Sequence, residues 1–358
     1  MKLLLVVGAR PNFIKIEPII RALKEKGVEY YLVHTGQHYD WDMSQSFFEG
    51  LHIPEPDVNL EMCSTGWGSI GSMMDSFANI LARENPDITV VVGDVDSTLA
   101  CALVVAKSKR GKLAHVEAGC RSFDRTMPEE INRVLTDQLS DYCFCNTHGD
   151  YNNLRVEGKE QEKIFVTGNV MVDALKYHLP KTVDIYAPES PFVLATFHRQ
   201  SNVDKWKPLE SILEALKELS ERIPVIVPLH PRTRKQIKKF GYEDYLKLTE
   251  RIVFVAPMNY LTFIKHLKNA KLVLTDSGGV QVDAAMVGTP CLTMRDTTEH
   301  VFTLDEGVNT LVGHSKEWIL VESIKILDNP KSIKVVHSLL DGKAAERIVN
   351  VLLGCKED

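Results

Sequence analysis

Short, continuously apolar runs recur along the chain, each followed by a polar or glycine-bearing turn and usually by a stretch of helical periodicity. Parallel strands that are covered on both faces have this pattern. The runs that predict strands in the first half are 3–7, 30–35, 88–93, 113–117, 141–145 and 164–167. Those in the second half are 192–197, 224–229, 252–255, 271–275, 290–294 and 309–312.

Helical periodicity fills most of the intervals between these runs. The predicted helices are 12–26, 69–84, 96–109, 128–140, 204–222, 259–268, 278–287 and 316–328. Strands that alternate with helices are typical of doubly wound α/β structure. Two sets of strands therefore predict two Rossmann-like domains that face each other across a cleft.

A segment without a clear core strand, near 168–190, separates the two sets. We expect an N-terminal domain over 1–170 and a C-terminal domain over 171–341. The last stretch, GKAAERIVNVLLG, has apolar residues at helical spacing. We expect 342–358 to form a helix that joins the first domain.

The composition argues against several classes of protein. The 358 residues carry a net charge of −6 without a block of like charges, which disfavours a dedicated nucleic-acid or anionic-membrane surface. No apolar run approaches the roughly 18 residues of a membrane span, and the first run lacks the basic flank of a signal peptide. The seven cysteines are scattered without a C-x-x-C spacing, which indicates reduced core thiols in a cytoplasmic protein.

Charged side chains gather where the predicted strands end, and ligands of open parallel sheets bind outside the carboxyl ends of the strands. In the first half these positions deliver Arg10, Asp94 and Glu117, and Glu129, Glu130 and Arg133 begin a later helix. In the second half they deliver His198, Arg199 and His230. Buried carboxylates at strand ends are either paired with arginines or poised as general acids and bases, and both alternatives stay open.

The sequence DSGG predicts an anion site in the second domain. Ser277 is expected to cap a helix that begins near Gly278, and Gly278 and Gly279 leave its first N–H groups open to a phosphate. An ordinary capped helix is the alternative. Asp283, farther along this helix, is placed to reach ribose hydroxyls, and Arg10 and Lys15 would add positive charge from the other domain.

Two short sequence motifs resemble the cofactor-binding or metal-binding motifs of other protein classes. Residues 66–71 spell G-x-G-x-x-G, but no buried strand precedes them, which disfavours nicotinamide binding. Asp94 and Asp96 form a D-x-D pair like that of metal-dependent sugar-nucleotide enzymes. Asp96 is better explained as the cap of the helix that follows.

Taken together, the strings GARPNFIK, GQH, GDVDSTL, HVEAGCRS, PEEINR, HR, DSGGVQ and MRDTTE resemble the non-hydrolysing UDP-N-acetylglucosamine 2-epimerases in order and spacing over nearly the whole chain. The resemblance implies a two-domain, glycosyltransferase-B-type fold, a homodimer, and no metal or nicotinamide. It implies conversion of UDP-GlcNAc to UDP-ManNAc by loss and re-addition of UDP through 2-acetamidoglucal.

The resemblance also implies roles for individual residues. Asp94 and Glu129 match the acid–base pair, and Glu117 matches a third carboxylate near the sugar. His198 and Arg10 match the groups that stabilise the departing diphosphate, assisted by Lys15 and Arg133. The expected uridine site comprises Met258, Phe263 and Asp283, although Phe263 fits a core position equally well.

The chain departs from the family pattern at two nucleotide-binding positions. Asp283 stands where the family usually has glutamate, and His300 stands where it usually has arginine. Gln37, Arg199 and His230 match positions at which bacterial members bind UDP-GlcNAc as an activator. The alternatives that remain are a hydrolysing 2-epimerase that releases ManNAc, a UDP-sugar glycosyltransferase of the same fold, and a catalytically silent UDP-sugar-binding protein.

Overall fold

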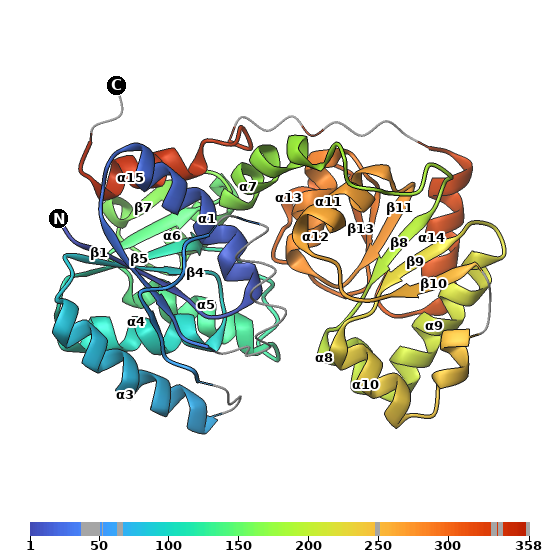
Figure 1. Ribbon diagram of the computed structural model, residues 1–358, viewed down its shortest axis with the longest axis horizontal. Coiled ribbons are helices and arrows are strands. Elements are labelled where there is room, and N and C mark those ends of the chain that lie inside the picture. The colour runs from blue at the N-terminus through green and yellow to red at the C-terminus, as the bar shows by residue number, and fades with distance from the viewer. Residues whose placement is uncertain are drawn as a thin grey trace. The chain divides into compact units, whose positions relative to one another are not determined.

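The structure is a computed structural model that describes residues 1–36, 51, 53–62, 67–247, 251–330, 335 and 339–355. Its contacts divide the chain into two compact units (Figure 1). Unit 1 comprises Met1–Tyr177 and His337–Asp358, and unit 2 comprises His178–Val336. No helix within the described ranges is long and apolar enough to cross a membrane.

Unit 1 is built on a parallel seven-stranded sheet in the order β3-β2-β1-β4-β5-β6-β7. The strands are β1 Leu3–Val7, β2 Tyr30–His34, β3 Val58–Asn59, β4 Ile88–Val92, β5 Lys112–Ala118, β6 Tyr142–Cys145 and β7 Ile164–Val166. Every residue of β1 and β4 is buried, as their continuously apolar sequences predict. The strand order reverses between β1 and β4, which is where parallel sheets of this kind hold ligands.

Helices cover both faces of the unit 1 sheet. Helices α3, α4 and α5 lie side by side on one face, and α1 packs with α15 on the other (Figure 1). The helices of unit 1 are α1 Arg10–Glu25, α3 Trp67–Glu84, α4 Asp96–Ser108, α5 Pro128–Leu139, α6 His148–Val156, α7 Val170–His178, which ends at the division, and α15 Ala344–Leu352, with a 3-10 turn at Gln161–Lys163.

A buried carboxylate fastens the C-terminal helix to unit 1. Asp173 of α7 accepts hydrogen bonds from the backbone N–H groups of Ala344 (3.2 Å) and Ala345 (2.7 Å), so it caps the start of α15. Arg347 of the same helix donates to the carbonyl of Thr167 at 3.1 Å. These bonds explain why residues so distant in sequence belong to the first unit.

Unit 2 repeats the architecture with a parallel six-stranded sheet in the order β10-β9-β8-β11-β12-β13. The strands are β8 Val193–Thr196, β9 Val225–Pro228, β10 Ile252–Val255, β11 Leu272–Thr275, β12 Cys291–Thr293 and β13 Asn309–Leu311. The helices are α8 Gln200–Val203, α9 Trp206–Ser220, α10 Pro231–Lys239, α11 Tyr260–Asn269, α12 Gly278–Val287, α13 Phe302–Asp305 and α14 Lys316–Asp328, with 3-10 turns at Leu179–Thr182 and Glu243–Lys247. The order reverses between β8 and β11.

The two parallel sheets with alternating helices confirm the predicted α/β, Rossmann-like fold class. Strand β3 and helices α6, α8, α10 and α13 are additions that the sequence pattern does not predict. Helix α10 is highly charged and buries only Thr233 and Ile237, so its apolar periodicity is too weak to indicate a helix.

Candidate functional site

The carboxyl ends of β1, β4 and β5 bring charged groups together in unit 1. Lys15 of α1 places its Nζ 2.6 Å from Oε1 of Glu117 in β5, and the two residues are only 7% and 4% exposed. Burial alone would lower the pKa of Lys15, but the negative charges of Glu117 and Asp94 outweigh burial and raise it. Lys15 is therefore a cation that compensates a buried carboxylate.

Glu117 lies where β5 shifts register against β6, between Val116 and Ala118, and has two unusual features. Its φ of +76° lies in the left-handed region, which is rare and unfavourable for a residue with a side chain. Its Oε2 is buried and has no hydrogen-bond partner among the described residues. A strained backbone conformation, together with a buried carboxylate oxygen that accepts no hydrogen bond from the described residues, is typical of a functional position.

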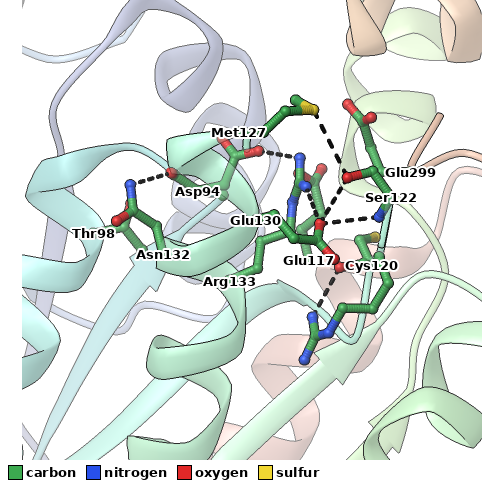
Figure 2. Close-up of polar contacts among 12 residues, drawn as sticks. Asp94, Thr98, Glu117, Cys120, Ser122, Met127, Glu130, Asn132, Arg133 and Glu299 are labelled. Carbon is green, nitrogen blue, oxygen red and sulfur yellow. Dashed lines mark hydrogen bonds and ion pairs between the residues drawn. The ribbon is translucent and has the colours of Figure 1, made fainter. Parts of the chain in front are cut away.

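Asp94, directly after the β4 end, is held by helix α5. Arg133 donates a hydrogen bond from Nη2 to Oδ2 of Asp94, and its Nη1 lies 3.0 Å from Oε2 of Glu130 (Figure 2). Asn132 donates from Nδ2 to the Asp94 carbonyl at 2.9 Å. Helix α5 thus fixes both the backbone and the side chain of Asp94.

The cap predicted at Asp96 is wrong. Val95 is the N-cap of α4 and Asp96 is the first residue of the helix. The Asp96 carboxylate instead accepts a hydrogen bond from Asn132 at 3.0 Å, so it links α4 to α5.

The two adjacent glutamates of α5 have different environments. Glu130 is buried and accepts hydrogen bonds from the backbone N–H groups of Ser122 and Phe123, both at 3.0 Å. Glu129, in the first turn of the helix, is only half-buried. Glu130 therefore organises the loop before α5, a role that sequence reasoning missed, whereas Glu129 keeps access to solvent.

A buried network of ion pairs and hydrogen bonds fixes the backbone next to the ends of β4 and β5. His115 of β5 lies 2.6 Å through Nδ1 from Asp137 and 2.8 Å through Nε2 from the carbonyl of Gly93. Asp137 also accepts a hydrogen bond from the N–H of Gly119 at 3.0 Å. Burial would raise the pKa of Asp137, but His115 and Arg121 lower it below its ordinary value. The network thus fixes Gly93, which precedes Asp94, and Gly119, which lies two residues after Glu117.

In unit 2, the end of β8 carries His198 and Arg199, and the neighbouring β11 is followed by Asp276. The fully buried Asp276 carboxylate accepts hydrogen bonds from the backbone N–H groups of His198 (2.9 Å) and Arg199 (2.8 Å). The ring of His198 stacks on that of His230 with centroids 4.8 Å apart. Three predicted residues thus lie together, and Asp276 joins them as one that sequence reasoning missed.

The start of α12 differs from the prediction in one respect. Ser277 occupies the N-cap position, but its side chain makes no capping hydrogen bond, so the predicted hydroxyl cap is wrong. A Cβ on Gly278 would lie 2.3 Å from Oε1 of Glu299 and 3.2 Å from Nε2 of His300. A side chain at 278 would therefore displace the Glu299 carboxylate, which favours glycine at this position.

Glu299 is part of a charged cluster beside the α12 N-terminus. Its Oε2 lies 2.8 Å from Arg295, and its Oε1 lies 4.0 Å from Arg199. A carboxylate beside a helix N-terminus and two arginines marks a region that favours negative charge.

The remaining residues of the predicted uridine site lie on or near α11 and α12. Asp283 is 3% exposed, and burial raises its pKa to about 8, although a hydrogen bond with Tyr260 opposes the shift. Met258 and Phe263 are partly buried against the core cluster around Phe192, which fits the core interpretation of Phe263.

Two of the predicted residues cannot be placed completely. Gln37 lies outside the described residues. Arg10 is the first residue of α1, but its side chain lies outside the described part of the structure.

The chain is similar to known proteins over most of its length. A family model described as UDP-N-acetylglucosamine 2-epimerase matches residues 21–353. A UDP-N-acetylglucosamine 2-epimerase of Methanocaldococcus jannaschii is 43% identical over 98% of this chain and 99% of its own. A UDP-2,3-diacetamido-2,3-dideoxy-D-glucuronate 2-epimerase of Pseudomonas aeruginosa is 43% identical over 91% of this chain and 92% of its own.

Among solved structures, the M. jannaschii UDP-GlcNAc 2-epimerase in complex with UDP-GlcNAc and UDP superimposes with a TM-score of 0.91 at 42% identity, covering 99% of this chain and 100% of that one. The similarity extends over both units, and the strings GDVDSTL, HVEAGCRS and DSGGVQ lie at the ends of β4, β5 and β11 described above. This chain belongs to the UDP-N-acetylglucosamine 2-epimerase family.

Proposed function

We propose that this protein interconverts UDP-GlcNAc and UDP-ManNAc by eliminating and re-adding UDP through 2-acetamidoglucal, without hydrolysis. The observation that carries the proposal is the two ion pairs at the strand ends of unit 1, Lys15 with Glu117 and Arg133 with Asp94. Each holds a carboxylate beside a buried cation at a place where ligands of parallel sheets bind.

The chemistry requires such carboxylates. The C2–H bond of the sugar has no neighbouring carbonyl, so its simple deprotonation is prohibitive. When a base removes the C2 proton, the C–H electron pair forms the C1=C2 double bond, and the C1–O pair leaves with UDP. Protonation of C2 on the opposite face and attack of UDP on C1 then give the epimer. The sequence is redox-neutral, so it needs no nicotinamide.

Asp94 and Glu129 are proposed as the acid–base pair, with Glu117 as a further carboxylate near the sugar. Arg133 bonds Asp94 and extends from the same helix as Glu129, so α5 fixes the first group and carries the second. Both groups are half-buried, so each combines a fixed position with access to a ligand.

Unit 2 is proposed to bind the nucleotide. The N-terminus of α12, at Ser277, Gly278 and Gly279, would receive the diphosphate, and Asp283 would receive the ribose. His198 and Arg10 would stabilise the charge that develops on the departing UDP, which is the kind of interaction that contributes most to catalysis. Met258 and Phe263 would contact the uracil.

The experiment that tests this function is product analysis. Purified protein is incubated with UDP-GlcNAc and EDTA, and products are followed by proton and phosphorus NMR. UDP-ManNAc at a constant total of UDP-sugar would support the proposal. Stoichiometric UDP and free ManNAc would identify a hydrolysing epimerase, and UDP formed only with an added acceptor would identify a transferase.

A second substrate is favoured by one specific observation. The P. aeruginosa UDP-2,3-diacetamido-2,3-dideoxy-D-glucuronate 2-epimerase is as similar in identity as the M. jannaschii enzyme. We therefore propose assaying both sugars side by side. A kcat/KM at least tenfold higher for the diacetamido uronate would reassign the substrate but not the reaction type.

The resemblance also leads us to propose a homodimer in which UDP-GlcNAc acts as an activator through Gln37, Arg199 and His230. Light scattering coupled to gel filtration tests the first part. Initial rates of UDP-ManNAc conversion with and without a trace of UDP-GlcNAc test the second.

A further inference from the structure

We propose that Asp276 is a positioning residue that fixes the orientation and the proton of His198. The inference rests on the proposed function for the catalytic meaning of His198, but its structural content is independent of that function. Asp276 directly follows β11, and His198 follows the neighbouring strand β8, so the pair lies at the topological switch point of the unit 2 sheet.

The groups that face the Asp276 carboxylate are hydrogen-bond donors. Besides the two backbone N–H groups of His198 and Arg199, Asn202 donates from Nδ2 to Oδ2 at 3.0 Å. The Nδ1 atom of His198 lies 3.3 Å from Oδ1. All these groups are donors or are able to donate, and a carboxylate accepts but does not donate when ionised. The side chain is fully buried, so these bonds replace its hydration.

One face of the His198 ring packs against the ring of His230. The two rings are close to parallel, at 27° and 4.8 Å between centroids. The Nδ1 of His230 accepts a hydrogen bond from the backbone N–H of Arg232 at 3.1 Å, so this nitrogen carries no proton. His230 is therefore neutral in this arrangement, with its proton on Nε2, and does not repel a cationic His198.

These contacts assign the protons of His198. An Nδ1 that faces the Asp276 carboxylate holds its proton, which leaves Nε2 as the nitrogen that exchanges a proton or, when charged, donates to an anion. The His198 side chain is 34% exposed, so it is accessible to a ligand while its backbone is fixed. The negative charge of Asp276 stabilises the imidazolium form, the form that a departing diphosphate needs.

The first test is nitrogen-15 NMR of histidine-labelled, full-length protein. Above the pH at which His198 titrates, the proposal predicts Nδ1 protonated and Nε2 unprotonated, with His230 in the opposite form. His198→Gln identifies the signals. An Nε2-protonated His198 would overturn the inference, whether or not the protein epimerises UDP-GlcNAc.

The second test is a double-mutant cycle of Asp276→Asn and His198→Ala, with turnover and KM for UDP-GlcNAc measured. If Asp276 acts through His198, Asp276→Asn lowers kcat by about 10²–10³-fold while KM changes less than about threefold. The double variant is then no slower than His198→Ala alone. Losses that multiply would overturn the proposal, because they would indicate independent structural damage.

The matched control is Asp204→Asn, the same substitution at a carboxylate that pairs with Arg232 on α10 and contacts neither ring in the contacts described. Its kcat is expected to stay within about threefold of wild type. If Asp276→Asn does not fold, as judged by circular dichroism, the NMR measurement on wild-type protein decides the inference alone. If wild type shows no turnover, the proposed function fails but the proton assignment is still tested.

Discussion

The ammonium group of Lys15 lies 2.6 Å from a carboxylate oxygen of Glu117, and both side chains are buried next to the end of β4. Gly93, at that strand end, has a φ of +70°, and a Cβ there would lie only 3.0 Å from Lys15 Nζ. The close approach of backbone, cation and carboxylate explains why the turn uses glycine. It also makes the ion pair sensitive to the loss of either partner.

Replacing Lys15 by methionine removes the cation but keeps most of the apolar stem. Glu117 would remain buried without its ion pair, so we expect the free energy of unfolding to fall by about 3–5 kcal/mol and kcat to fall at least about 100-fold. Urea denaturation and steady-state kinetics measure the two effects. Lys2→Met is the matched control, because Lys2 pairs with Glu84 on the surface and should contribute only about 0–1 kcal/mol. Equal effects of the two variants would contradict our assignment.

Asp94→Asn and Glu129→Gln test the proposed acid–base pair. Each removes a proton acceptor with little change of shape, so we expect epimerisation to be abolished while UDP binding stays within about tenfold of wild type. Calorimetry measures the binding and NMR the turnover. Glu130→Gln provides a comparison, because Glu130 bonds the Ser122 loop and is expected to act mainly on stability. Near-normal turnover in Asp94→Asn or Glu129→Gln would contradict the assignment of these two residues as the acid–base pair.

Asp283 predicts a pH dependence of stability. Its folded pKa is raised to about 8 from an ordinary value of 3.8, so unfolding releases a proton between these pH values. The stability associated with the protonated group is fully present below about pH 4 and is lost as pH rises toward 8, with a slope of up to about 1.4 kcal/mol per pH unit.

Asp283→Asn removes this titration. We therefore expect the variant to gain stability relative to wild type as pH rises from 5 to 8.5, as measured by urea midpoints at each pH. If the difference in stability between wild type and Asp283→Asn is the same at pH 5 and at pH 8.5, the raised pKa of Asp283 is contradicted.

Gly278→Ala tests the packing at the start of α12. The new methyl group would lie 2.3 Å from Oε1 of Glu299, so we expect a loss of about 1–3 kcal/mol in stability and weaker UDP binding. Gly71→Ala is the matched control, since Gly71 lies within α3 and its Cβ would meet nothing within 4 Å. That change should be neutral or slightly stabilising. Unchanged UDP affinity in Gly278→Ala would separate this glycine from the nucleotide site.

His300→Arg introduces a permanent positive charge next to Gly278. The His300 backbone is fixed, because its N–H donates to the Thr298 hydroxyl at 3.1 Å and its carbonyl accepts from the Thr303 hydroxyl at 2.7 Å. We expect UDP to bind about 3–10-fold more tightly, as measured by calorimetry. His314→Arg, at an exposed position of the same unit, controls for net charge. Equal affinities would mean that residue 300 does not face the nucleotide.

The sequence predicts the strands well because buried parallel strands are continuously apolar and end in recognisable turns. Strand β1 matches its predicted range, and β10 and helix α14 match theirs. Helix α6 escaped prediction because it buries few apolar residues, although its capping box, Thr147 with Asp150, was available as a signal.

Positions at strand ends indicate Asp94, Glu117 and His198. At the end of β11 the same rule draws attention to Ser277, Gly278 and Gly279 and passes over Asp276, whose role depends on its bonds with His198 and Arg199. Asn132 and Glu130 are different, because their roles depend on contacts with residues 94, 96 and 122 that only the folded chain brings together. The adjacent Glu129 and Glu130 show this limit most clearly, since only the fold buries Glu130 against the Ser122 loop and leaves Glu129 half-buried.

The most direct test of the account is epimerisation of UDP-GlcNAc in D2O with EDTA present. Elimination and re-addition of UDP predict deuterium at C2 of every UDP-ManNAc molecule formed, seen as loss of the H2 signal and collapse of its coupling to H1. UDP-ManNAc that retains protium at C2, or free ManNAc released together with UDP, would contradict the proposed mechanism.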